Sequence, residues 1–489
     1  MKSLILFSMF ACTLGGAGVR AQDTLWTRAY GGDANDYLQA VRLTGDGGYQ
    51  LCGATESFGA GGGDVYLVRI DAGGDTLWTR TYGGPELDAA SAIDRIGDGG
   101  FILAGETASF GAGDHDVYLL RTDADGDTLW TRTIGGPSFE RGSGVVATTD
   151  GRFVIGGRTS SFGAGDHDAY LVITDAQGNV LSTHTYGDCE TDIAFAVQET
   201  RDGGFILAGV TNSSGAGGFD YYLVKTDRDG GLEWSETYGG EQTDWCHYVV
   251  QTSDDGFLLV GSTHSWGSGN GDVYLVKTGN GGEIQWTRVY GGPHSDGANS
   301  ALQTPDGGYL VASFSGDFSA GWGDIYLLRT DAEGDTLWTQ TYGRGGADNR
   351  ETPGEIRPTD DGHYILPASS EAFGNGIDDA WILKLADDAL SRVSPEVGDD
   401  RQSASPRLLE NYPNPFTGET HIPFSLPRAG RMTIGVYDLL GRKVAHLGSG
   451  WMPAGVHVVS WNGAGRPSTF YFVRLVTEDS VSSRKLMLR

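Results

Sequence analysis

The sequence repeats every 52 residues, and this repeat constrains the fold more than any other feature of the chain. The first copy reads DTLWTRAYGG, and the seven related segments begin at Asp23, Asp75, Asp127, Asn179, Gly231, Glu283 and Asp335. Copies that keep the same spacing throughout indicate one structural unit per copy, packed against its neighbours.

Each copy contains four short runs that are rich in β-branched and aromatic residues. In the copy that begins at Asp75 these runs cover 75–82, 89–96, 101–108 and 116–123. Gly- and Asp-rich turns separate them, and no run shows the 3.6-residue period of a helix. The pattern therefore predicts four antiparallel strands per repeat and an all-β fold.

Four-stranded units of this length, arranged around an axis, form β-propellers. The first copy supplies only one strand, 23–30, before the first complete set, and the last copy ends after a strand at 381–385. We therefore predict a seven-bladed β-propeller over 22–388, in which strand 23–30 completes the last blade. A β-solenoid is the alternative, but it does not explain why the two ends supply complementary parts of one unit.

Two aromatic columns recur with the repeat. The first, in the third strand of each predicted blade, contains Tyr66, Tyr118, Tyr170, Tyr222, Tyr274, Tyr326 and Trp381. The second, in the fourth strand, contains Trp26, Trp78, Trp130, Trp234, Trp286 and Trp338. Because each such ring buries ~150–250 Å², we interpret both columns as packing between blades. Cys52 stands where the next copy has Ala104, which predicts a small buried side chain.

Composition excludes some functions and the N-terminus predicts export. The chain carries 34 Lys and Arg against 64 Asp and Glu, a net charge of −30, which argues against binding to nucleic acid or to an anionic membrane. Lys2, the apolar run 4–14 and Ala21 predict a signal peptide over 1–21, with a lipoprotein cleaved before Cys12 as the alternative. No later apolar run is long enough to predict a transmembrane segment.

The repeat stops near residue 389. Residues 389–408 are rich in Ser, Pro and Asp, which predicts an exposed linker. Residues 409–489 again alternate apolar and polar positions, which predicts a small β-sandwich. This last region carries nine Lys and Arg against five Asp and Glu, so the acidity of the chain belongs to the propeller and the linker.

The C-terminal region contains the segments NYPNPF at 411–416, VYDLLGR at 436–442 and KLMLR at 485–489. In this order they resemble the type A C-terminal sorting domain of the type IX secretion system, and the matching residues are Asn411, Pro413, Asn414, Pro415, Phe416, Gly441, Arg442 and Lys485. The resemblance implies an Ig-like fold, Sec export to the periplasm and passage through the outer membrane by the type IX secretion machinery. It also implies release or attachment to surface lipopolysaccharide, often after removal of the domain.

One acidic column recurs just before the innermost strand of each predicted blade: Asp36, Asp88, Glu140, Asp192, Asp244, Asp296 and Asp348. We expect it at the channel mouth, on the face with the longer, Gly-rich loops. One interpretation is a site for Ca²⁺ or a polar ligand, since close like charges are costly unless neutralised. The other is that each carboxylate accepts N–H bonds from its own loop. Ca²⁺ is the one cofactor that the pattern suggests.

Departures from the repeat indicate where an asymmetric function would lie. The fifth copy has Trp245, His247 and Trp266 where the second copy has small residues or Phe, and exposed Trp near a carboxylate suits a sugar ring; scattered repacking is the alternative. No hydrolase or nucleotide-binding motif is present. We therefore expect a non-enzymatic surface or secreted module that binds a glycan or a protein. The alternatives are a glycan hydrolase or lyase that uses two of the carboxylates, and a structural spacer.

Deletion of 409–489 should leave the propeller folded and block its export. The reason is that the repeat array is already complete at residue 389, and the linker and the change of charge separate it from the C-terminal region. Residues 22–389 alone should be soluble and β-rich by circular dichroism, and fractionation of the native host should find the truncated protein in the periplasm. Normal surface display of the truncated protein would refute the sorting assignment.

Overall fold

The computed structural model describes most of the chain, which divides into two compact units, 1–391 and 392–489. The described residues are 24–267, 269–316, 323–343, 350–374, 378–386, 406–408, 416, 418–426, 430–438, 442–452, 455–477 and 481–488. They contain strands and no helix, as the repeat predicts, so no described helix could cross a bilayer. The predicted signal peptide 1–21 and most of the predicted linker lie outside the described residues.

Six sheets of the first unit are antiparallel meanders of four consecutive strands. The first three contain β2 (Asp36–Leu43), β3 (Tyr49–Thr55), β4 (Asp64–Ile70), β5 (Thr76–Tyr82); β6 (Asp88–Arg95), β7 (Phe101–Thr107), β8 (Asp116–Thr122), β9 (Thr128–Ile134); β10 (Glu140–Ala147), β11 (Phe153–Thr159), β12 (Asp168–Thr174) and β13 (Val180–Tyr186). The next three contain β14 (Asp192–Glu199), β15 (Phe205–Thr211), β16 (Asp220–Thr226), β17 (Leu232–Tyr238); β18 (Asp244–Gln251), β19 (Phe257–Thr263), β20 (Asp272–Thr278), β21 (Ile284–Tyr290); β22 (Asp296–Gln303), β23 (Tyr309–Ser315), β24 (Asp324–Thr330) and β25 (Thr336–Tyr342). The prediction of four strands per repeat is confirmed.

A further sheet joins the beginning of the unit to its end. It contains β1 (Thr24–Tyr30), β26 (Glu351–Pro353), β27 (Arg357–Pro358), β28 (Tyr364–Ser370) and β29 (Asp379–Leu385). Strand β1 runs antiparallel to β29, with Tyr30 opposite Ala380, so the predicted pairing of the N-terminal strand is present.

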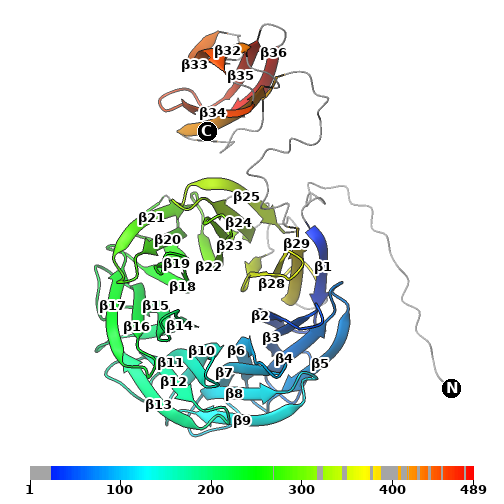
Figure 1. Cartoon of the computed structure of the whole chain (residues 1–489), viewed down its shortest axis with the longest axis vertical. Coiled ribbons are helices and arrows are strands. Elements are labelled where there is room, and N and C mark those ends of the chain that lie inside the picture. The colour runs from blue at the N-terminus through cyan, green and yellow to red at the C-terminus, as the bar shows by residue number, and fades with distance from the viewer. Residues whose placement is uncertain are drawn as a thin grey trace, which may run out of the picture. The chain divides into compact units, whose positions relative to one another are not determined.

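The sheets of the first unit follow one another around a common axis, as in a propeller (Figure 1). Strands β2, β6, β10, β14, β18 and β22 lie innermost, and strands β5, β9, β13, β17, β21 and β25 lie at the periphery. Neighbouring sheets are in contact, including β2 with β28 and β23 with β26. This arrangement places the first strand of each four-stranded sheet around the centre of the unit.

Apolar side chains fill the space between neighbouring sheets. The tyrosine column and Trp381 are at most 8 % exposed. In the tryptophan column, Trp26 meets Tyr49 of the next sheet edge to face, with ring centroids 6.3 Å apart. The prediction that both columns pack between neighbouring sheets is confirmed, and Cys52 is fully buried as expected.

Tight turns occupy the opposite face from the longer loops. Gly126 has a φ of 82°, which glycine adopts at little cost, and the Asp123 carboxylate accepts N–H bonds from Asp125 and Asp127 at 2.9 Å. The aspartate and the glycine of this segment therefore serve a hairpin turn.

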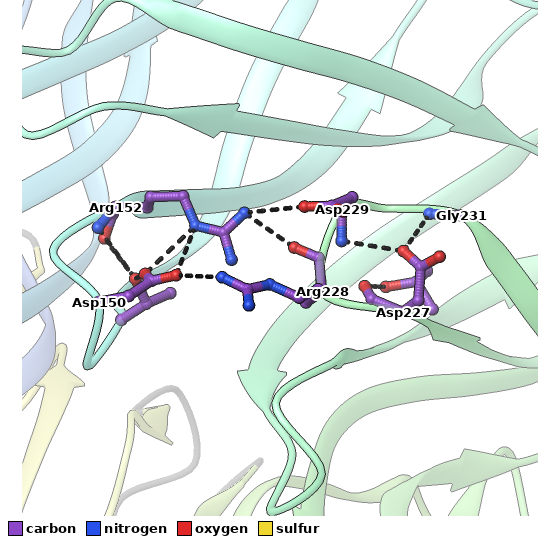
Figure 2. A network of polar contacts seen from close by, with 8 residues as sticks. Asp150, Arg152, Asp227, Arg228, Asp229 and Gly231 are labelled. Carbon is purple, nitrogen blue, oxygen red and sulfur yellow. Dashed lines mark hydrogen bonds and ion pairs between the residues drawn. The ribbon is translucent and has the colours of Figure 1, made fainter.

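Charged side chains join turns of successive sheets on this face (Figure 2). Arg152 bonds the Asp150 carboxylate of its own turn and reaches the carbonyl of Arg228 at 2.9 Å. Arg228 in turn donates to Asp150 at 2.9 Å. Exposed pairs of this kind contribute at most about 1 kcal/mol each, so the apolar packing carries most of the stability.

The second unit consists of two antiparallel sheets around one core. One contains β30 (Arg407–Leu408), β31 (Glu419–Leu426) and β34 (Gly455–Asn462). The other contains β32 (Gly430–Tyr437), β33 (Lys443–Met452), β35 (Phe470–Thr477) and β36 (Val481–Met487). Ile422, Ile434, Trp461 and Val473 come from four of these strands and share one buried cluster.

Three of the matching C-terminal residues are described. Phe416 is buried and its ring lies 5.4 Å from that of Trp461. Arg442 pairs with Asp438 at 2.7 Å, and the Lys485 ammonium lies 4.3 Å from the centre of the Phe470 ring. The other matching residues, Asn411, Pro413, Asn414, Pro415 and Gly441, lie outside the described residues.

Removal of β1 should destabilise the first unit strongly. A chain that starts at Asp33 loses the strand paired with β29, uncovers Trp381 and leaves an open strand edge. Loss of buried packing equivalent to one Trp costs ~3–5 kcal/mol, so this chain should melt well below one that starts at Asp23 or should aggregate. Differential scanning calorimetry of the two chains checks this, and equal melting temperatures would show that β1 does not hold the unit together.

Candidate functional site

The predicted acidic column begins the innermost strands and is at most 1 % exposed among its six described members. Each of these carboxylates accepts an N–H bond of 2.6 to 3.0 Å from the residue four positions earlier, the donors being Gly32, Gly84, Gly136, Asp188, Gly240 and Gly292. Serine hydroxyls add further bonds, for example Ser265 to Asp244 at 2.8 Å. The loop interpretation of these residues thus has direct support in the geometry.

The seventh member of the column, Asp348, lies outside the described residues. Glu351 takes the equivalent place in the structure: it stands opposite Ser370 in the last sheet, as Asp36 stands opposite Thr55 in the first complete one. The Ser370 hydroxyl donates to Glu351 at 3.1 Å. Relative to the 52-residue spacing, the carboxylate of the last sheet stands three positions further along the chain.

A second buried carboxylate column, which the sequence analysis missed, starts the third strand of each sheet: Asp64, Asp116, Asp168, Asp220, Asp272, Asp324 and Asp379. Asp64 accepts an N–H bond from Ala60 at 2.7 Å, so this column also holds its own loop. Burial raises the pKa of Asp220, and the charge of Asp244 adds to the effect. Within the described residues no group of His, Cys, Asp or Glu could hold a metal ion.

A cavity of about 870 Å³ lies between the innermost strands. None of the described column carboxylates lines it. Its walls come from residues of the inner strands β2, β6, β10, β14, β18 and β22, together with Arg158 of β11 and residues 352–358 of the last sheet. These are the positions at which the repeats differ from one another. The cavity is therefore the part of the first unit where an asymmetric site can form.

A partly buried polar network lines part of the cavity. Arg42 donates to Asp94 at 3.0 Å and to Glu355 at 2.6 Å, and the Tyr248 hydroxyl donates to Glu355 at 2.6 Å. Burial opposes the ionisation of Glu355, but the charges of Arg357 and Arg42 and the bond from Tyr248 lower its pKa to about 2. The network joins four sheets and keeps a carboxylate charged inside the unit.

An aromatic wall forms one side of the cavity. Phe195 of β14 and His247 of β18 line it, with ring centroids 5.7 Å apart. Trp245 packs behind them, 6.0 Å from Phe195 and 5.0 Å from Phe219. Desolvation lowers the pKa of His247 to about 4, so its ring is neutral at physiological pH.

Two arginines line the cavity on the neighbouring sheet. Arg141 of β10 and Arg158 of β11 stand opposite each other in the strand pairing. Arg141 lies 3.4 Å from Glu106, and the Arg158 guanidinium lies 4.7 Å from the centre of the Phe139 ring. The cavity thus offers an aromatic surface and cationic donors within one space.

The structure separates the three predicted residues of the fifth copy. His247 lines the cavity, Trp245 supports its wall, and Trp266, 43 % exposed, lies on a loop between β19 and β20. Phe195, Arg158 and Glu355 also line the cavity and were not predicted from the sequence. Arg158 breaks its column, where the neighbouring repeats have Glu106 and Val210, so comparison of the repeats column by column could have found it.

Comparisons with known proteins identify the C-terminal region. Residues 410–489 match the family of secretion system C-terminal sorting domains. This agrees with the resemblance of the type A motifs and supports a secreted or cell-surface protein that is exported through the periplasm and handled by the type IX secretion machinery.

Other comparisons of the chain give more distant relatives. The regulatory protein FlaEY of Caulobacter vibrioides is 26 % identical over 157 residues, which are 27 % of this chain and 16 % of that protein. The crystal structure of a protein of unknown function from Bacteroides caccae is also similar. The match covers 60 % of this chain and 93 % of that protein's chain, with 13 % identity and a TM-score of 0.35. One from Dyadobacter fermentans covers 74 % and 98 %, with 13 % identity and a TM-score of 0.42.

The stability of the first unit should depend on pH through His247. Its pKa is about 4 when folded and about 6.5 when unfolded, so between these values the unfolded state binds more protons. The free energy of unfolding should therefore fall by about 1–3 kcal/mol as the pH drops from 6.5 to 4, in addition to the effect of other groups. Urea unfolding of the wild type and of His247→Gln at both pH values isolates this contribution. The same pH dependence in both proteins would contradict the assignment.

Proposed function

We propose that this protein is a secreted or surface-attached, seven-bladed β-propeller that binds a glycan in its central cavity without catalysis. In this proposal residues 1–21 direct Sec export, and an Ig-like domain at 409–489 directs type IX secretion. The domain is removed as the propeller is released or attached to surface lipopolysaccharide. Pairing of β1 with β29 and the contacts between successive sheets support a closed ring.

The aromatic wall of the cavity is the observation that carries the proposal. A sugar ring has an apolar face, which packs on aromatic rings such as Phe195, and hydroxyls that bond polar groups such as His247. The volume of about 870 Å³ falls within the roughly 300–1,000 Å³ that is typical of small-molecule sites. A protein ligand needs roughly 1,200–2,000 Å² of interface, which favours the loop face around Trp266 as the alternative site.

The carboxylates support binding better than hydrolysis. An acid and a base need pKa values that differ because their surroundings differ, whereas the described members of the column sit in near-identical loops and are buried. Glu355 is held charged by Arg42 and Arg357. A hydrolase or lyase remains the alternative function.

Screening of the chain from Gln22 on a glycan array and against polysaccharide substrates tests the proposal. Phe195→Ala should weaken binding of a captured glycan about tenfold or more, because it removes the apolar surface of the wall. Phe110→Ala, on an exposed loop away from the cavity, is the matched control and should bind as the wild type does.

Other outcomes identify the alternatives. Loss of binding in Trp266→Ala with full binding in Phe195→Ala would move the site to the loop face. A second outcome is that the wild type releases reducing ends from a polysaccharide. If Asp244→Asn abolished that release while keeping the wild-type melting temperature, hydrolysis would replace binding as the function.

A further inference from the structure

Arg141 and Arg158 form a pair of like charges that the fold does not require. They stand directly opposite each other on β10 and β11, where like charges are destabilising because the side chains project side by side. In the sheets on either side the equivalent pairs are Ala89 with Glu106 and Ile193 with Val210. The two cations are therefore a particular feature of this sheet and of the cavity that they line.

One carboxylate compensates part of this charge. Glu106 of the preceding sheet lies 3.4 Å from Arg141 and 3.2 Å from His115, so it serves two basic groups. Arg141 also donates to the Ser91 hydroxyl at 3.0 Å. These contacts fix the position of Arg141. They do not include a direct ion pair with Arg158.

Arg158 has no such partner among the described residues. No described carboxylate lies within ion-pair distance of it, and its Nε–H is buried without an acceptor. By contrast, the buried Arg69, Arg121 and Arg329 each bond an aspartate of a nearby turn. Burial and the charge of Arg141 lower the pKa of Arg158, and the charge of Glu106 offsets this only in part.

The Phe139 ring holds the guanidinium of Arg158 in place. The guanidinium carbon lies 4.7 Å from the ring centre, a cation–π contact that orients the plane of the group. A guanidinium fixed in this way presents its N–H edge for two parallel bonds to a carboxylate or sulfate. An anion bound there would also relieve the repulsion between Arg158 and Arg141.

We propose that Arg158 and Arg141 bind an anionic substituent, a carboxylate or a sulfate, of the carbohydrate that enters the cavity. This inference rests on the proposed function for the identity of the carrier, and it specifies an acidic glycan. The protein as a whole is strongly acidic, with a net charge of −30, so long-range attraction does not bring such a ligand to it. Recognition depends instead on the local pair of arginines.

Matched acidic and neutral oligosaccharides test the inference. The chain from Gln22 is titrated by calorimetry with an oligogalacturonate and with its methyl ester, and with a sulfated and an unsulfated galactan oligomer. The wild type should bind at least one acidic form about ten- to hundredfold more tightly than its neutral partner. Arg158→Gln should abolish that preference, whereas Arg132→Gln, the same change of charge on the exposed strand β9, should preserve it.

A second measurement separates this inference from the proposed function. Sulfate is added while the Nε–Hε signal of Arg158 is followed by NMR; the shift should saturate in the wild type and be lost in Arg141→Gln. Saturation without binding of any oligosaccharide would refute the glycan proposal and keep an anion site. Equal binding of acidic and neutral forms, a preference that survives Arg158→Gln, or a sulfate shift that does not saturate would overturn the inference.

Discussion

Each described crossover between sheets of the first unit depends on a buried carboxylate that is bonded to its own loop. Asp36 accepts the Gly32 N–H and the Ser57 hydroxyl, both at 2.7 Å, and it is fully buried. A buried carboxylate without such donors would cost several kcal/mol, so the loop and the acid require each other. The second column, represented by Asp64, secures the loop of the neighbouring hairpin in the same way. These bonds fix how one sheet leads to the next.

Because the loops hold the fold, the residues that face the cavity can vary in sequence. Because the crossovers and the aromatic columns determine the packing of the sheets, the alternating positions of the inner strands can differ between repeats without loss of the fold. Phe195 of β14, His247 of β18 and Arg42 of β2 are residues of this kind, and Arg158 of β11 and Glu355 of the last sheet also line the cavity. A site with its own chemistry thus arises inside a repetitive frame.

The second unit has a separate physical basis. It buries its own cluster around Trp461, and it carries a basic balance of charge where the rest of the chain is acidic. Each unit therefore has the core that an independent domain needs. The family match of 410–489 assigns export to this unit, while binding is a property proposed for the first.

The sequence by itself determined the strands, the turns, the aromatic packing and the pairing of β1 with β29, because these follow from local alternation and from the 52-residue spacing. Only the tertiary structure decided which departures from the repeat meet. Arg42 and Glu355, which bond each other, are 313 positions apart in the sequence. The 52-residue spacing predicted Asp348 as the seventh acidic residue of the column, whereas the strand pairing places Glu351 there. The loop bonds of the acidic column and the isolation of Arg158 likewise depend on contacts between distant segments. Periodicity encodes local geometry, whereas a cavity is made by side chains that only folding brings together.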